Sequence, residues 1–279
     1  MARAIVVAAV LAGALLAGCG GSPSKRGSRH PAAIASRPLP TRVVGGAAAG
    51  AAIDRLIHAG RPVYCGGDRP YAALTFDDGP GVYTRLALRI LRKAHAPGTF
   101  FLVGRNLARF HGLARADAHA GALGNHTWTH PMLPSLPSGA IESEIARTSA
   151  GIRAAAGVAP RLFRPPYEAR NATVDSSATR NRLLEILWNV DSHDSEGANY
   201  AQIAHHVLTG ISPGAIVLMH ENRGQTIRAL KFNILPALRR RHIRLVTVPQ
   251  LLALDPPTPR ELAQGRKGCR YHAPVSAGA

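Results

Sequence analysis

The segment YAALTFDDGP (residues 71–80) joins an apolar run to two adjacent carboxylates and a Gly-Pro pair. A largely apolar run, broken here only by Thr75, is typical of a strand buried in a parallel sheet, and the Gly-Pro pair turns the chain away from the end of that strand. Asp77 and Asp78 repel each other at the strand end unless a cation lies nearby. The pair suits a site where one carboxylate binds a metal ion and the other takes a proton from water. A capped turn explains this segment equally well on its own.

Short apolar runs alternate with longer helix-like segments after residue 71, which predicts parallel βα units. We predict seven strands, at Ala72–Phe76, Thr99–Val103, Ala122–Gly124, Leu162–Arg164, Glu185–Val190, Ala215–Met219 and Arg244–Val248. Helices are predicted around Tyr83–Ala94, Arg105–Ala118, Ser138–Ala156, Val174–Leu183, Tyr200–Leu208 and Thr226–Arg240. Ser138, Asp175 and Asn199 stand where they could cap three of these helices.

Polar residues of catalytic type follow several of these strands at their carboxyl ends. They are Asp77 with Asp78, His126, Arg164, Asp191 and His220. An open doubly wound sheet fits the alternation too, but residues from several strand ends meet at one mouth in a closed barrel. The sequence therefore predicts an α/β fold with a distorted, incomplete (β/α) barrel of about seven parallel strands.

The segment HTWTH (residues 126–130) carries two histidines four residues apart. On a helical turn this spacing places both imidazoles on one face, which suits a metal ion. With Asp78, the pair His126 and His130 makes three protein ligands, and a three-ligand site leaves a position open for water and substrate. Two surface histidines are the alternative interpretation of the segment taken alone.

The N-terminal region indicates export and attachment to a membrane. The apolar run Ala4–Leu16 follows Arg3 and is too short to span a bilayer. The sequence LAGC, ending at Cys19, resembles a bacterial lipobox, and a plain signal peptide is the alternative. We therefore expect a lipoprotein signal peptide over residues 1–18, a lipidated Cys19 with a flexible linker over 19–62, a catalytic domain over 63–254 and a tail over 255–279. A short helix over Ala47–His58 is expected within the linker.

Cysteine content and charge support an extracytoplasmic protein. Without Cys19 the three cysteines leave one even pair, Cys65 and Cys269, which can form a disulfide outside the cytoplasm or remain as two thiols. The net charge is 34 − 16 = +18, with 5% aromatic residues among the 279. Because the basic residues are spread along the chain with few aromatics between them, the sequence favours a solvated or envelope-binding surface over a nucleic-acid site.

Five segments together resemble the polysaccharide deacetylase family, whose NodB-type domain defines carbohydrate esterase family 4. They are TFDDGP (75–80), HTWTH (126–130), RPPY (164–167), WNVDSHD (188–194) and LMH (218–220). The resemblance covers Tyr71 to Leu252. Two departures concern the substrate: Glu168 follows Tyr167 where the family commonly has glycine, and Ser195 follows Asp194 where it has tryptophan.

The resemblance assigns roles to single residues. It implies that Asp77 is the general base and that Asp78, His126 and His130 bind one divalent metal ion, usually zinc. It implies that Arg164 orients the catalytic carboxylate and that the Tyr167 amide stabilises the oxyanion. His220 would be the general acid, tuned by a carboxylate for which Asp191 is preferred to Asp194. The implied substrate-binding residues are Leu218, Tyr167 and Trp188.

These features predict a lipid-anchored hydrolase on the outer face of the bacterial cell membrane, facing the cell wall. The expected reaction removes acetyl groups from N-acetylated sugars of an envelope polysaccharide, with peptidoglycan as the expected polymer. An esterase for O-acetyl groups of the xylan type is one alternative. A catalytically silent glycan-binding lipoprotein is another, and nucleic acid is not an expected partner. The sequence gives no indication of oligomeric state.

Overall fold

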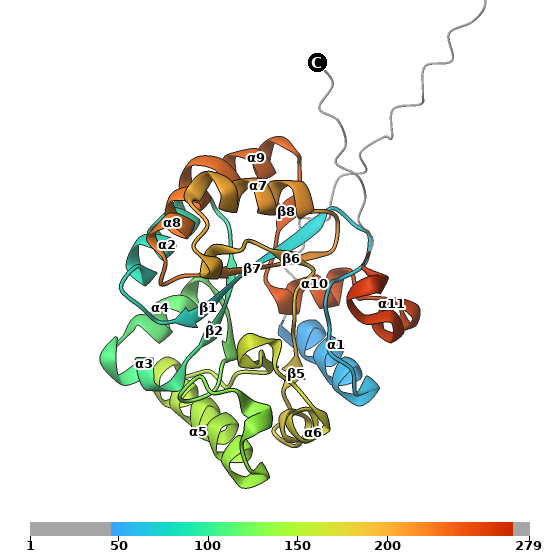
Figure 1. Cartoon of the computed structure of the whole chain (residues 1–279). Helices are drawn as coiled ribbons and strands as arrows, with labels where there is room; N and C mark the ends of the chain where they lie inside the picture. Colours follow the sequence, from blue (N-terminus) through green and yellow to red (C-terminus); the bar gives the residue numbers. More distant parts are fainter. Residues whose placement is uncertain (1–45, 270–279) are drawn as a thin grey trace, which may run out of the picture. The chain divides into compact units, whose positions relative to one another are not determined.

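The core of the fold is a curved sheet in which every ladder between strands is parallel (Figure 1). The structure, a computed structural model, describes residues 46–269. The strands run in the order β5-β4-β3-β2-β1-β7-β6, and β8 pairs with the start of β1. They span β1 (Tyr71–Gly79), β2 (Gly98–Leu102), β3 (Gly121–Asn125), β4 (Leu162–Phe163), β5 (Leu184–Glu185), β6 (Val190–Asp191), β7 (Ala215–His220) and β8 (Arg244–Leu245).

The run predicted as one strand over Glu185–Val190 forms parts of two strands instead. β5 pairs with β4 at one edge of the sheet, and β6 pairs with β7 at the other. Only residues 186–189 connect these edges, and the five steps from Glu185 to Val190 span at most about 18 Å. The sheet must therefore curl until its edges approach each other, which produces the incomplete barrel that the sequence predicts.

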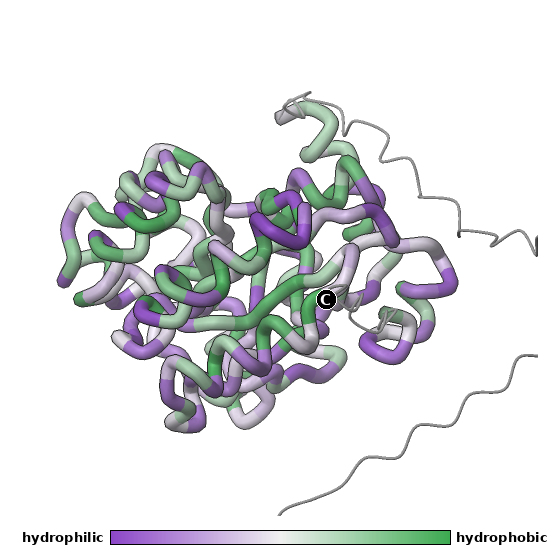
Figure 2. The backbone as a smooth tube through the Cα atoms, turned by 90° about the horizontal axis from the view of Figure 1, so that it is seen from above, coloured by the Kyte–Doolittle hydropathy of each residue, from purple (hydrophilic) through white to green (hydrophobic). Residues whose placement is uncertain are grey.

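Apolar side chains fill the interior of this barrel and the layer between sheet and helices. β1 is buried along almost its whole length, as expected for the central strand of a parallel sheet. Phe76 and Phe100 stack on neighbouring strands with ring centroids 5.4 Å apart. In Figure 2 segments of hydrophobic residues run through the middle of the folded unit, and many of the hydrophilic residues lie along its turns.

Helices surround the sheet on its outer side (Figure 1). They span α1 (Gly46–Ala59), α2 (Thr84–Lys93), α3 (Gly104–Arg109), α4 (Leu113–Ala120), α5 (Ser138–Ala156), α6 (Ala172–Arg180), α7 (Tyr200–Gly210), α8 (Gly224–Ala229), α9 (Leu235–Arg240), α10 (Val248–Leu254) and α11 (Pro259–Gln264). No helix among residues 46–269 is both long and apolar enough to cross a membrane.

Two helices predicted as continuous are interrupted in the structure. The run Arg105–Ala118 divides into α3 and α4 because Gly112 adopts a left-handed conformation with φ 76°. Between α8 and α9 the run Thr226–Arg240 contains a π-helical turn over Leu230–Ile234, just before Pro236, which has no amide hydrogen to donate.

The predicted helix caps agree with the structure at one position out of three. Asn199 caps α7, accepting hydrogen bonds from the amides of Ala201 and Gln202. Ser138 is the first residue of α5 and makes no capping bond. Asp175 lies inside α6, whose cap is Asn171. Helix α5 begins at Ser138 as predicted, so Pro137 occupies its cap position, and α6 begins at Ala172, two residues before the predicted start.

The folded unit extends beyond the predicted catalytic domain at both ends. Helix α1 lies in the stretch assigned to the linker, yet it packs against α10 and buries Ala49, Ala52, Ile53 and Leu56. Beyond residue 254, α11 and a 3₁₀ turn over Gly265–Gly268 precede Cys269. Ordered elements therefore continue past residues 62 and 254, where the sequence analysis placed the boundaries of the catalytic domain. The signal peptide, Cys19 and the tail from residue 270 lie outside the described residues.

The structure joins Cys65 and Cys269 in a disulfide across 204 residues of sequence. A cross-link over so long a loop removes much conformational entropy from the unfolded chain. We expect Cys65→Ser with Cys269→Ser to lower the free energy of unfolding by about 2–5 kcal/mol, measured by urea denaturation. Wild type unfolded under reducing conditions should match the double variant, and an unchanged midpoint in both samples would contradict the prediction.

Candidate active site

Two successive carboxylates face one site because the backbone of β1 is irregular at its carboxyl end. Successive residues of a regular strand point to opposite faces. Here the register with β2 shifts between Phe76 and Gly79, and Asp78 has φ 67°. This irregularity turns the Asp78 side chain toward the side occupied by Asp77. His126 Nε2 consequently lies 3.7 Å from Asp77 Oδ2 and 3.8 Å from Asp78 Oδ1.

Arg164, which follows β4, is fully buried and fixes the orientation of Asp77. Its Nη1 donates to Asp77 Oδ1 at 2.8 Å and to Thr75 Oγ1 at 2.7 Å. Its Nε and Nη2 donate to the carbonyls of Ile186 and Leu187, in the segment that connects β5 to β6. Burial lowers the pKa of Arg164, and the charge of Asp77 opposes that effect. The guanidinium therefore holds Asp77 Oδ1, and Oδ2 remains directed toward His126.

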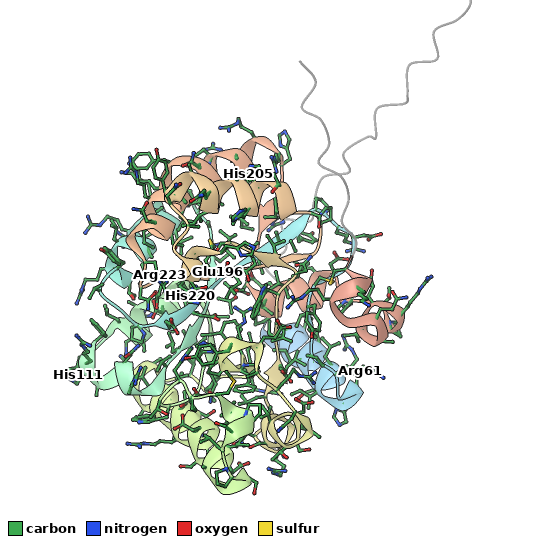
Figure 3. All side chains as sticks on the ribbon, viewed as in Figure 1. Arg61, His111, Glu196, His205, His220 and Arg223 are labelled. Atoms are coloured by element: carbon green, nitrogen blue, oxygen red, sulfur yellow. A yellow bond between two sulfur atoms is a disulfide. The ribbon has the colours of Figure 1, made fainter. Side chains whose placement is uncertain are left out.

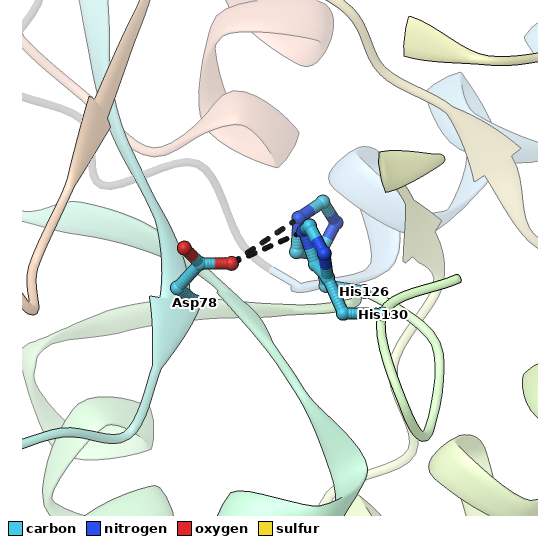
Figure 4. Close-up of side chains that lie close together, drawn as sticks. All are labelled: Asp78, His126 and His130. Atoms are coloured by element: carbon cyan, nitrogen blue, oxygen red, sulfur yellow. Dashed lines mark ion pairs between the residues drawn. The ribbon is translucent and has the colours of Figure 1, made fainter. Parts of the chain in front are cut away.

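Asp78, His126 and His130 form a group of metal-binding type (Figure 4). One donor atom from each lies within 4.8 Å of the others, and His130 Nε2 is 3.3 Å from Asp78 Oδ1. The histidines follow β3 in a loop, so the predicted helical turn is wrong. Left-handed conformations at Thr127 and His130 bring the two rings together in that loop.

Both histidines are held in orientations suited to metal binding. His126 Nδ1 lies 2.7 Å from the carbonyl oxygen of Arg164, which leaves Nε2 facing the group. Such a contact on the far ring nitrogen is common for histidines that bind metals. Burial and the neighbouring His126 lower the pKa of His130, which favours the neutral, ligating imidazole. Two imidazole nitrogens and one carboxylate oxygen fit a divalent transition-metal ion.

His220, the last residue of β7, is paired with Asp194, so the predicted preference for Asp191 is wrong. His220 Nδ1 lies 2.6 Å from Asp194 Oδ1, and the His220 amide donates to Asp194 Oδ2 at 2.8 Å. Thr226, which the sequence analysis missed, also donates to Asp194. The carboxylate of Asp191 instead turns back into its own loop, where it accepts hydrogen bonds from Trp188 Nε1 and the His193 amide.

The Asp194 contact determines the protonation of His220. Burial alone lowers the pKa of His220, but the hydrogen bond and charge of Asp194, with the charges of Asp77 and Asp78, raise it to about 9. The pKa of Asp194 is lowered: burial acts to raise it, and the hydrogen bond and charge of His220 outweigh that effect. At neutral pH His220 is therefore an imidazolium that can donate a proton. In Figure 3 it lies near the middle of the folded unit, whereas His111 lies at the outer edge.

The residues expected to contact substrate surround this centre. Tyr167 is 63% exposed, and its hydroxyl lies 3.1 Å from His130 Nδ1. Leu218 is buried two residues before His220 on β7, and so on the same face of the strand. Trp188 is half-buried, with its ring centroid 5.5 Å from the guanidinium of Arg164. The structure thus brings the predicted catalytic, metal-binding and substrate-contacting residues to one end of the barrel. Asp191 lies there too, at the end of β6, but it contacts Trp188 rather than His220.

Comparison with known proteins assigns the chain to the polysaccharide deacetylase family. The sequence profile of that family matches residues 66–184. A peptidoglycan-N-acetylglucosamine deacetylase of Bacillus cereus is 33% identical over 185 residues, which cover 64% of this chain and 67% of that protein. The chain belongs to this family.

Two further relatives show how functions vary in proteins of this kind. A bifunctional xylanase/xylan deacetylase of Cellvibrio japonicus is 36% identical over 152 residues, covering 54% of this chain but 23% of that protein. The crystal structure of a family 4 pseudoenzyme from Bacillus anthracis superposes with a TM-score of 0.65 at 30% identity, covering 68% of each chain. Family membership therefore does not by itself settle substrate or activity.

Proposed function

We propose that this protein is a metal-dependent hydrolase that removes acetyl groups from the N-acetylated sugars of peptidoglycan. One observation carries the proposal: three chemical units meet at one end of the barrel. They are Asp77 held by Arg164, the donor group of Asp78 with both histidines, and the His220–Asp194 pair. A base, a metal-binding group and an acid are the parts that hydrolysis of an unreactive amide requires.

In the proposed mechanism the residues divide the work by position. Zinc bound by Asp78, His126 and His130 would lower the pKa of a water molecule and polarise the acetyl carbonyl. Asp77 accepts the proton of the attacking water through Oδ2. The amide of Tyr167 donates to the oxyanion, a contact of a kind typically worth about 3–4 kcal/mol. His220 protonates the leaving amine, and Leu218 accommodates the acetyl methyl group.

The substrate assignment is tested by acetate release from three glycans under identical conditions. We expect release from peptidoglycan and from N-acetylated chitin oligosaccharides, and little from O-acetylated xylan. Preferential release from xylan would support the esterase alternative, which the similarity to the Cellvibrio xylan deacetylase favours. No release from any of the three, with the metal bound, would support the silent glycan-binding alternative. The presence of both Asp77 and His220 argues against that alternative, because a binding module needs neither a base nor an acid.

We also propose that Cys19 is lipidated and anchors the enzyme to the outer face of the cell membrane, beside the peptidoglycan. The lipobox-like sequence LAGC supports this proposal, because two or three acyl chains anchor a protein firmly. Cys19→Ala is expected to move most of the protein from the membrane to the soluble fraction, measured by immunoblotting of fractionated cells. Retention of the variant in the membrane fraction would refute the anchor.

A further inference from the structure

The turn over Gly265–Gly268, near the end of the described chain, places Arg266 against the rim of the active site. Arg266 Nη2 lies 2.5 Å from Glu168 Oε2. Its guanidinium carbon lies 5.3 Å from the ring centroid of Tyr64 and 5.5 Å from that of Trp188. Guanidinium groups combine such ring contacts with directional hydrogen bonds. Arg266 is therefore held by contacts with three residues that are distant from it in sequence.

The disulfide fixes both sides of this arrangement. Cys269 follows Arg266 by three residues, and Cys65 is adjacent to Tyr64. The bond between the cysteines thus ties the turn that carries Arg266 to the segment that carries one of its aromatic partners. Arg266 reaches the rim through a covalently fixed segment, although it lies about 100 residues from Glu168 in the sequence.

Glu168 belongs to a strained turn that includes Tyr167. Both residues adopt left-handed conformations, with φ 61° at Tyr167 and φ 56° at Glu168. Residues with a Cβ atom rarely adopt this region, and they remain there only where surrounding contacts hold them. The amide of Ala169 closes the turn by donating to the carbonyl of Pro166 at 3.0 Å. The ion pair with Arg266 restrains the side chain at the second strained position.

We propose that Arg266 is a positioning residue: by holding Glu168 it maintains the left-handed turn and, with it, the direction of the Tyr167 amide. The inference rests on the proposed function, in which that amide donates to the oxyanion. Small displacements of an oriented group reduce turnover strongly. The C-terminal segment would therefore contribute to catalysis without touching substrate.

A double-mutant cycle on the full chain tests this proposal through acetate release from N-acetylchitohexaose. Arg266→Ala is expected to lower kcat by about 10- to 100-fold, with KM changed less than about 2-fold. Glu168→Gly is expected to retain at least about a third of kcat, because glycine adopts the left-handed region without restraint. In that background Arg266→Ala should have almost no further effect. Arg266→Lys should restore part of kcat, and Lys267→Ala, at the exposed neighbouring position, serves as the matched control.

Hydrogen exchange over residues 166–169, followed by mass spectrometry, gives a readout that does not depend on catalysis. Exchange should be faster in Arg266→Ala than in wild type and unchanged in Lys267→Ala. The proposal would be overturned if exchange were unchanged in Arg266→Ala, or if that substitution changed mainly KM. It would also be overturned if Arg266→Ala lowered kcat equally in the wild-type and Glu168→Gly backgrounds, or if Glu168→Gly were itself inactive. A wild-type chain that releases acetate neither from N-acetylchitohexaose nor from peptidoglycan would refute the proposed function instead, and exchange would still test whether Arg266 restrains the turn.

Discussion

Asp194→Asn is expected to lower kcat for acetate release about 100- to 1,000-fold, because the asparagine cannot stabilise a protonated His220. In the structure Asp194 accepts hydrogen bonds from the amide of His220 and from Thr226 while contacting His220 Nδ1. The amide side chain can keep part of this geometry but removes the negative charge. The loss therefore measures the contribution of that charge to the proton-donating form of His220.

The same substitution should change the pH profile in a defined direction. A general acid works while it is protonated, so wild-type activity should decline only as the pH rises through about 9, the pKa of His220. Without the Asp194 charge, burial dominates and the pKa of His220 falls toward or below its ordinary value of 6.5. The alkaline decline of kcat should accordingly move to lower pH by about 2 units or more.

Asp191→Asn is the matched control, because Asp191 contacts Trp188 and the His193 amide rather than His220. In this variant the alkaline decline of kcat should occur at the same pH as in wild type. Its kcat should fall less than about 10-fold, since the substitution removes no group that reacts. If the alkaline decline of kcat shifted further in Asp191→Asn than in Asp194→Asn, Asp194 would not be the residue that keeps His220 protonated.

Asp77→Asn is expected to lower kcat by about 1,000-fold or more, because it removes the proposed base. It should retain the bound metal ion, since Asp77 lies outside the group formed by Asp78, His126 and His130. It should also lower thermal stability, because the buried Arg164 loses the negative charge that compensates it. These outcomes are measured by acetate release, zinc analysis of dialysed protein and thermal denaturation.

Asp78→Asn separates the two adjacent aspartates by role. It should lose both activity and tightly bound zinc, whereas Asp77→Asn should lose only activity. If both variants kept zinc equally well, the assignment of Asp78 as a ligand would be wrong. If Asp77→Asn retained more than about a tenth of wild-type kcat, Asp77 would not be the base.

The fold was largely predictable because its sequence signals are local. The apolar run before Asp77 is long enough to identify the central strand, and the alternation with helix-like segments identifies the parallel arrangement. The short strands β5 and β6 were not separable, because no glycine or proline marks a break between Glu185 and Val190. The first end of this segment pairs with β4 and the second with β7. These pairings form only in the folded chain, so the local sequence does not reveal them.

The candidate site shows a similar division. Motif spacing identified the histidines and aspartates, but not the loop that carries His126 and His130, because the left-handed residues within it are not glycines. The choice between Asp191 and Asp194 depended on where each side chain turns after β6, and both lie in one short segment. Nothing in the sequence pattern linked Arg266 to Glu168, since only the folded chain and its disulfide bring them together.

The central claim is that this chain hydrolyses N-acetyl groups on glycans with a metal ion held by Asp78, His126 and His130. The most direct test measures acetate release from peptidoglycan by three samples of the full chain. They are the untreated protein, the protein stripped of metal by a chelator that is then dialysed away, and the stripped protein after zinc is added back. We predict release that disappears with the chelator and returns with zinc. Release that persists in protein shown by metal analysis to be zinc-free would contradict the claim, as would no release from zinc-loaded, folded protein.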